Sequence, residues 1–227
     1  MSRFRVSAVK PTLAIIGGTG ALGSSLARSF AAAGFAVVIG SRTAEKGAEF
    51  AQSLTVGAGK PAPKGTSNEA AAQAGEIVFI TVPYATQPGI VEAIRPHLDG
   101  KLVVDTTVPL MPPKVARVQL PSEDSAAVAT QRRLGAGARV VSGFHNVAAH
   151  KLKSGDPVDC DVLIFGDDPK DREIVIGIAK AIGLRALHAG PLANSTAAEA
   201  LTSVLIGINR AYKVDGAGIR ITGIGEA

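Results

Sequence analysis

The stretch IIGGTGALGSSLARSF, residues 15–30, joins a short apolar run to a segment whose apolar residues recur at helical spacing. It contains the pattern Gly-x-Gly-x-x-Gly at Gly18, Gly20 and Gly23. Between a strand and a helix, such glycines permit a tight turn, close backbone approach to a pyrophosphate and close packing of the helix. The start of the helix then offers free N–H groups to phosphate. The stretch predicts a dinucleotide-binding loop, with a glycine-rich turn that holds no ligand as the alternative.

Strand-like and helical segments alternate on both sides of this loop. We predict strands at 12–17, 35–41, 75–83, 101–109, 138–145, 160–167 and 184–190, and helices at 21–34, 43–54, 87–98, 123–135, 169–183 and within 193–211. This alternation is typical of a parallel sheet with crossover helices. We therefore predict an α/β fold, a Rossmann-type doubly wound parallel sheet with a small C-terminal α/β part packed against it. The expected division is an NADP-binding domain at 12–145 and a smaller part at 146–227 that completes the acceptor site.

Composition narrows the class of protein. The chain has 227 residues, and Cys160 is its one cysteine, so an internal disulfide is impossible and a reducing, cytoplasmic compartment is expected. No apolar run approaches the ~20 residues of a membrane span. The net charge of +5 comes without interleaved basic and aromatic residues, which argues against nucleic acid as a partner.

The end of the second expected strand indicates which dinucleotide binds. NAD sites usually carry Asp or Glu there to accept from the ribose hydroxyl. This chain has Gly40, Ser41 and Arg42 instead, with Lys46 one turn into the next helix. A hydroxyl and two cations suit a 2′-phosphate, because Arg can bind two of its oxygens. The segment predicts NADP(H), with ordinary solvated charges at Arg42 and Lys46 as the alternative.

Several dehydrogenase classes do not fit. Neither Tyr84 nor Tyr212 precedes a Lys by four residues, as the short-chain class requires. The chain after residue 190 is too short for the large helical region of the β-hydroxyacid and pyrroline reductases. One Cys and scattered His residues cannot supply a zinc cluster, so no metal is expected. These histidines are His97, His145, His150 and His188.

Six segments together resemble a known family. In chain order they are AIIGGTGALG, VVIGSRTAEK, FITVPY, VVSGFHNVAAHKL, FGDD and LHAGPLANSTAAEALTSVLIGIN, spanning about Thr12 to Asn209. They are similar to the NADPH-dependent F420 reductases. The resemblance implies direct hydride transfer between NADPH and the deazaflavin coenzyme F420 as co-substrate, in a protein that aligns the two rings and excludes water. It also implies a homodimer, in keeping with the apolar final helix.

The resemblance implies roles for individual residues. The pyrophosphate is expected at Thr19, Gly20, Ala21 and Leu22, and the 2′-phosphate at Ser41, Arg42 and Lys46. The nicotinamide is expected at Val82, Pro83, Val108 and Ala149. The deazaflavin is expected at His145, Val147, Asn194 and Ser195. His145 is also the candidate catalytic residue, since it can donate a hydrogen bond to the deazaflavin, the alternative being a structural histidine at a strand end.

The acceptor is the less determined partner. Tyr84, Asn146 and Ala148 depart from residues common in the family, and all three touch the expected ring-binding surface. An NADPH-dependent reductase of a flavin or another small acceptor is one alternative, and a non-catalytic NADPH-sensing module is another. Five basic residues are candidates for the anionic tail of the deazaflavin, or else form a solvated basic face: Arg132, Arg133, Arg139, Lys151 and Lys153.

Overall fold

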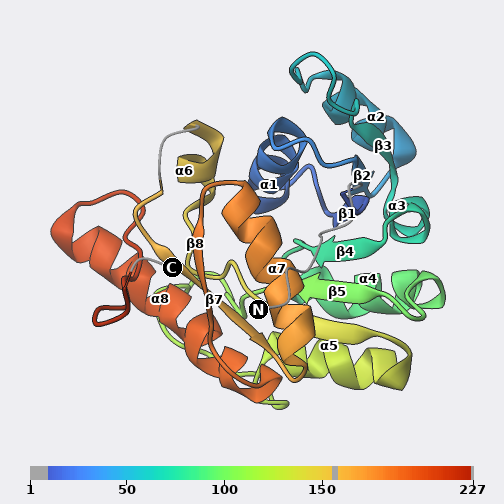
Figure 1. Ribbon diagram of the computed structural model, residues 1–227. Coiled ribbons are helices and arrows are strands. Elements are labelled where there is room, and N and C mark those ends of the chain that lie inside the picture. The colour runs from blue at the N-terminus through green and yellow to red at the C-terminus, as the bar shows by residue number, and fades with distance from the viewer. Residues whose placement is uncertain (1–9, 155–157, 226–227) are drawn as a thin grey trace, which may run out of the picture.

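The computed structural model describes residues 10–154 and 158–225, and its centre is a single eight-stranded sheet in the order β3-β2-β1-β4-β5-β6-β7-β8 (Figure 1). The first six strands follow the order 3-2-1-4-5-6 that defines the Rossmann fold. The strands are β1 (Leu13–Ile16), β2 (Val37–Ser41), β3 (Lys64–Ser67), β4 (Ile77–Ile80), β5 (Leu102–Asp105), β6 (Arg139–Ser142), β7 (Asp161–Gly166) and β8 (Arg185–His188).

Helices cover both faces of the sheet. The buried clusters place α1, α6 and α7 on one face and α3, α4 and α5 on the other, while α8 packs against α5 (Figure 1). The helices are α1 (Ala21–Ala32), α2 (Ala44–Gln52), α3 (Asn68–Ala74), α4 (Gln87–Ile94), α5 (Ala126–Leu134), α6 (Ala149–Ser154), α7 (Pro169–Ala181) and α8 (Ser195–Tyr212). The α/β, doubly wound architecture expected from the sequence is thus confirmed.

The central strand shows why the sheet must be covered twice. In β1, Leu13 and Ile15 join the core on the α1 side, whereas Ala14 and Ile16 join the core on the α3 side. All four side chains are fully buried. A strand that is apolar on both faces is stable only between two helical layers, which is the arrangement observed.

The sheet is not parallel throughout, because the last two strands, β7 and β8, run opposite to the first six. β7 runs antiparallel to β6, pairing Val141 with Gly166 and Ser142 with Phe165, and β8 is parallel to β7. In its described part, the connection between β6 and β7 contains the short helix α6 and no crossover to the other edge of the sheet. The chain therefore re-enters the sheet from the edge at which β6 ended.

The sequence patterns did not predict β3, α3 or α6. β3 has the sequence Lys-Gly-Thr-Ser at the sheet edge and none of its residues is buried, so it lacks the apolar run that marks a strand. The packing of β3 against α2 depends on glycine instead. A Cβ added at Gly65 would lie 1.9 Å from the carbonyl oxygen of Gly47, so α2 lies directly on the β3 backbone.

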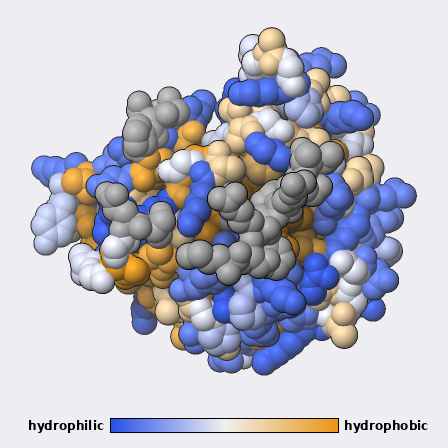
Figure 2. Space-filling model, viewed as in Figure 1, coloured by the Kyte–Doolittle hydropathy of each residue, from blue (hydrophilic) through white to orange (hydrophobic). Residues whose placement is uncertain are grey.

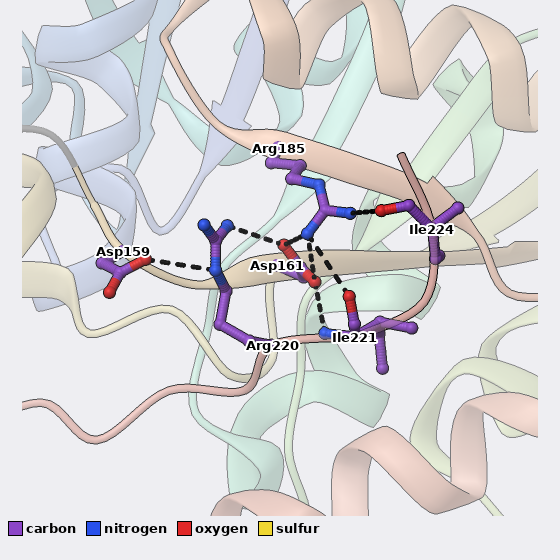
Figure 3. A network of polar contacts seen from close by, with 6 residues as sticks. All are labelled: Asp159, Asp161, Arg185, Arg220, Ile221 and Ile224. Carbon is purple, nitrogen blue, oxygen red and sulfur yellow. Dashed lines mark hydrogen bonds and ion pairs between the residues drawn. The ribbon is translucent and has the colours of Figure 1, made fainter. Parts of the chain in front are cut away.

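The chain after α8 is attached to the start of β7 (Figure 3). The fully buried Asp161 carboxylate accepts from Arg185, Arg220 and the backbone N–H of Ile221. Arg220 also pairs with Asp159 at 3.2 Å. These hydrogen bonds satisfy the buried carboxylate and fix the C-terminal segment beside α6, where Gly216 lies against Ala148 and His150.

Candidate functional site

The carboxyl ends of five parallel strands, β1, β2, β4, β5 and β6, meet at one edge of the sheet. β1 lies between β2 and β4, so the strand order reverses beside it. Ligands of open α/β sheets bind in the crevice at this reversal. Most of the residues predicted for the site follow one of these five strand ends, so the fold brings them to the same edge.

The glycine loop between β1 and α1 has no room for side chains. Gly17 has φ +75°, and a Cβ added at Gly18 would lie 2.8 Å from the carbonyl oxygen of Ile15. A Cβ at Gly23 would lie 2.4 Å from Thr81 Oγ1 and 2.7 Å from the carbonyl oxygen of Gly17. Real Cβ atoms do not approach this closely, so the path of the loop requires glycine at these positions.

The first turn of α1 is open to an anion. Thr19, Gly20 and Ala21 are exposed, Leu22 is half-buried, and Gly20 begins the helix without a capping side chain. No acidic residue lies in this turn. Unsatisfied N–H groups with the positive end of the helix dipole suit phosphate, so this cradle of glycines fits the pyrophosphate of a dinucleotide.

The end of β2 fits a second phosphate. Ser41 is 3 % exposed, and its Oγ lies 3.3 Å from Thr19 Oγ1 in the glycine loop. Arg42 and Lys46 are exposed, and neither has an ion-pair partner within the described residues. Thr43 caps α2 by accepting from the backbone N–H of Lys46. The cap places Lys46 in the first turn of α2, four residues after Arg42.

Threonines tie the next strand ends together. Thr81 Oγ1 donates to the carbonyl of Ile16 at 2.7 Å, and Thr106 Oγ1 donates to that of Ile80 at 2.8 Å. Three of the four predicted nicotinamide residues follow these two threonines. Val82 is buried against Gly17, Pro83 is exposed, and Val108 is half-buried.

A buried polar cluster holds the end of β5. Asp105 is fully buried and accepts from Thr130 Oγ1 at 2.6 Å, from Gln87 Nε2 at 2.7 Å and from the backbone N–H of Thr107 at 2.8 Å. Burial raises the pKa of this carboxyl, and hydrogen bonds to Thr130 and Thr107 oppose the shift. The cluster fixes the turn that leads to Val108.

His145 follows β6 in a segment bound to α8. It is 7 % exposed, its Nε2 lies 3.0 Å from Ser142 Oγ, and burial lowers its pKa to about 3. The imidazole is therefore neutral at physiological pH. Thr202 Oγ1 donates to the His145 carbonyl, and Asn146 Nδ2 donates to the Ala198 carbonyl and to Thr202 Oγ1. The adjacent Val147 is buried in the core on the α1 side.

The start of α8 is bound to the start of α5. Ser195 is fully buried and donates to Ser125 Oγ at 2.9 Å, whereas the neighbouring Asn194 is exposed. The Glu199 carboxylate accepts from the backbone N–H groups of Ala126 and Ala127. Burial raises the pKa of Glu199 to about 8. Helix α8 thus joins the loop after β5 to the segment after β6.

The remaining predicted residues fall into two groups. Ala149 begins α6, which packs on α1, and Lys151 and Lys153 lie on the same helix. Arg132 and Arg133 lie in the last turn of α5, and Arg139 begins β6. Arg139 lies at the amino edge of the parallel strands and is not brought to the site, whereas the charges of Arg132 and Arg133 act on Glu123, and that of Arg133 also acts on Tyr84 after β4.

Three polar residues that the sequence patterns did not single out lie beside the site. Asp105 has a visible signal, because it ends an apolar run at the carboxyl end of a strand. Glu199 and Asn68 have none, since their partners are distant in the chain. Glu199 binds the start of α5, and Asn68 binds the glycine loop.

Comparisons with known proteins identify the family of this chain. Residues 12–109 match the family model described as NADP oxidoreductase, coenzyme F420-dependent. The F420-dependent NADP reductase of Methanothermobacter thermautotrophicus is 37% identical over 94% of this chain and 96% of its own length. The enzyme of that name from Methanocaldococcus jannaschii is 38% identical over 93% of this chain and 98% of its own.

Solved structures show the same fold. A proposed F420-dependent NADP reductase from Arthrobacter sp. FB24 superposes with a TM-score of 0.79 at 23% identity, covering 94% of this chain and all of its own. A second structure, protein SMa0349 from Sinorhizobium meliloti, has a TM-score of 0.67 at 26% identity, covering 82% of this chain and 88% of its own. Within residues 10–154 and 158–225, no helix has the length and apolar character to cross a membrane.

Proposed function

The chain belongs to the family of F420-dependent NADP reductases and is an oxidoreductase that transfers hydride between NADP(H) and coenzyme F420; we propose that it does so along the carboxyl edge of the sheet. NADP would span this edge from Ser41 at the end of β2 to Val108 after β5. The deazaflavin would lie against the segment after β6. The small C-terminal part, residues 146–227, would complete that acceptor side through α8.

The observation that carries the NADP placement is the pairing of two phosphate subsites. The glycine loop leaves backbone N–H groups for a pyrophosphate, and Thr19 of that loop contacts Ser41, which stands beside the exposed cations Arg42 and Lys46. A pyrophosphate and a 2′-phosphate are attached to the same ribose in NADP. Two adjacent anion subsites therefore fit NADP(H), and a carboxylate that would repel the 2′-phosphate is not present at Ser41 or Arg42.

NADP(H) supplies or accepts the hydride when bound. The chain's own contribution is alignment and exclusion of water. Val82, Pro83, Val108 and Ala149 are proposed to line the nicotinamide side with apolar surface. Val147, Asn194 and Ser195 are proposed to border the deazaflavin.

His145 is proposed to contact the acceptor as a neutral hydrogen-bonding group. Its low pKa keeps the imidazole uncharged, and its Nε2 hydrogen bond to Ser142 fixes the ring orientation. If Ser142 donates to Nε2, the proton lies on Nδ1, which can donate to a carbonyl oxygen. A His145→Ala variant is expected to lower turnover or deazaflavin affinity about tenfold, whereas His97→Ala at the opposite edge is expected to change neither. Unchanged kinetics in His145→Ala would remove this residue from the site.

The test of the whole proposal is hydride transfer to oxidised F420. Purified protein is mixed with NADPH and F420, and the loss of the deazaflavin's visible absorbance is followed. NADH and free flavins serve as controls. Bleaching with NADPH and not with NADH supports both the cofactor and the acceptor. Tight NADPH binding without bleaching would contradict F420 as the acceptor while leaving the NADP site in place.

The assembly is proposed to be a cytoplasmic homodimer. The side of the molecule that carries α8 shows hydrophobic surface (Figure 2). Val204 and Ile208 of α8 are 45 % and 37 % exposed, one turn apart on the same stripe. A buried free cysteine suits a reducing compartment. Light scattering that gives the mass of one chain at working concentration would contradict the dimer.

A further inference from the structure

Asn68 binds the glycine loop, and no contact with a ligand has been assigned to it so far. It is the first residue of α3, directly after β3, and is only 4 % exposed. Its Oδ1 accepts the backbone N–H of Gly17 at 3.1 Å. Gly17 is the residue that turns the chain out of β1, with φ +75°. The Asn68 side chain therefore holds the first turn of the cofactor loop.

This contact determines the orientation of the carboxamide. Because a backbone N–H can only donate, the atom that faces Gly17 must be the oxygen. The Nδ2 group then points away from Gly17, and within the described residues it donates to no acceptor. A side chain that is buried to this degree normally has both of its polar ends paired. Among the described residues only Thr107 Oγ1 is a fully buried side-chain atom without a partner, so Asn68 Nδ2 is open to solvent and free to donate to a bound ligand.

The position of Asn68 identifies that ligand. Ser67, the preceding residue, pairs in register with Ser41 at the end of β2. A Cβ added at Gly40 would lie 2.9 Å from Asn68 Oδ1. Asn68 is thus placed between the glycine loop and Ser41, the two subsites proposed for the pyrophosphate and the 2′-phosphate. In NADP the group between these phosphates is the adenosine ribose.

We propose that Asn68 is a positioning and cofactor-binding residue, whose Oδ1 holds the Gly17 turn while its Nδ2 donates to the adenosine ribose or the 2′-phosphate that the ribose carries. This inference rests on the proposed NADP site. The same side chain would then both hold the glycine loop in its conformation and bind the cofactor. Asparagine suits both tasks because it offers an acceptor and a donor without charge, whereas Asp at this place would repel the 2′-phosphate.

The decisive variant is Asn68→Asp. It retains an oxygen for the Gly17 N–H but replaces the donor with a negative charge. We expect the ratio of NADPH to NADH affinity, measured by cofactor fluorescence, to fall about tenfold, because the charge repels only the cofactor that carries a 2′-phosphate. Affinity for adenosine 2′,5′-bisphosphate, which contains the ribose and lacks the nicotinamide half, is expected to fall by a similar factor. Gln73→Ala removes an exposed carboxamide from the same helix and is the matched control, with no change expected.

A purely structural role predicts different results. A ratio of NADPH to NADH affinity that stays at the wild-type value in Asn68→Asp would place the carboxamide away from the 2′-phosphate and would overturn the proposal. A second measurement does not depend on cofactor preference. The Asn68 side-chain amide resonances, identified by their loss in Asn68→Asp, are expected to shift when adenosine 2′,5′-bisphosphate is added to the wild-type protein. Resonances that do not move at saturation would also overturn it. Wild-type protein that fails to bind NADPH would contradict the proposed function itself.

Discussion

The two ends of the site are built by different means. At the nucleotide end, backbone geometry forms the site, because Gly18 and Gly23 leave no space for a Cβ and the first turn of α1 is open. At the acceptor end, buried side chains connect distant segments, as when Asn146 after β6 binds Thr202 of α8. At the nucleotide end, a substitution that adds a side chain should be the most damaging change. At the acceptor end, a substitution that removes a hydrogen bond should be the most damaging change. This difference predicts how each end responds to substitution.

The largest effect is expected at the glycine loop. Gly23→Val places atoms where Thr81 Oγ1 and the Gly17 carbonyl already lie, at 2.4 and 2.7 Å from the added Cβ. Thr81 Oγ1 is held by its hydrogen bond to the Ile16 carbonyl and the Gly17 carbonyl belongs to the turn, so α1 would have to move away from the sheet. We expect a loss of about 3 kcal/mol in the free energy of unfolding and the loss of NADPH binding. Thermal unfolding and fluorescence titration measure the two effects.

A second helical glycine provides the control for Gly23→Val. Gly177 lies in α7, and a Cβ added there meets no atom within 4 Å. Gly177→Ala is expected to stabilise the protein by up to about 1 kcal/mol, because alanine favours the helix. If Gly23→Val were as stable as Gly177→Ala, the nucleotide end would not be constrained by its backbone.

The same contrast explains how much the sequence predicted. The glycine loop is local, so Gly18, Gly20 and Gly23 predicted both the turn and its ligand class. The Asp105 cluster and the pairing of Glu199 with α5 join segments far apart in the chain, and no spacing rule connects them. β3 was missed because its partner is the Gly47 backbone rather than an apolar face. The antiparallel direction of β7 was not predicted, because the length of the segment between β6 and β7 does not determine whether β7 pairs parallel or antiparallel to β6.

Glu199 is expected to make the free energy of unfolding depend on pH, with a smaller effect than Gly23→Val and within a limited pH range. Its carboxyl has a pKa near 4.5 when unfolded and about 8 when folded, so the folded state binds more protons between these values. The free energy of unfolding should therefore fall as pH rises, by up to about 1.4 kcal/mol per pH unit. His145, with its pKa lowered to about 3, acts in the opposite direction only below about pH 6.5.

Chemical denaturation between pH 6.5 and pH 8 isolates the Glu199 contribution. Wild-type protein should lose about 2 kcal/mol over this interval from this group. Glu199→Gln should remove that part of the slope, whereas Glu49→Gln on the exposed face of α2 should retain it. Identical slopes in wild type and Glu199→Gln would show that the buried carboxyl does not titrate there.

Asn146→Ala is expected to cost about 1–2 kcal/mol and to act on the acceptor alone. The change removes two hydrogen bonds to α8, from Nδ2 to the Ala198 carbonyl and to Thr202 Oγ1. The KM for F420 should rise severalfold while the Kd for NADPH stays constant. Asn209→Ala on the same helix removes an acceptor for the Ala217 N–H and is the matched control. An equal rise in KM in both variants would mean that α8 stability, rather than the His145 segment, sets acceptor binding.

The smallest effect on stability, and a clear effect on the cofactor, is expected for Arg42→Ala. Arg42 is exposed and unpaired within the described residues, so its removal should change the free energy of unfolding by less than about 0.5 kcal/mol. The NADPH to NADH affinity ratio should nevertheless fall about tenfold, because the lost cation faces only the 2′-phosphate. Exposed charges are screened by salt, so the wild-type ratio should itself decline between low and high ionic strength, and the decline should be weaker in Arg42→Ala.

Arg95→Ala, which removes an exposed cation from the segment before β5 at the opposite edge, should leave the ratio and its salt dependence unchanged. If both arginine variants changed the ratio equally, net charge rather than a local site would determine the preference. If only Arg42→Ala changes it, the nucleotide end combines two independent parts. A rigid backbone cradle would bind any dinucleotide, and a flexible exposed cation would select the phosphorylated one at almost no cost in stability.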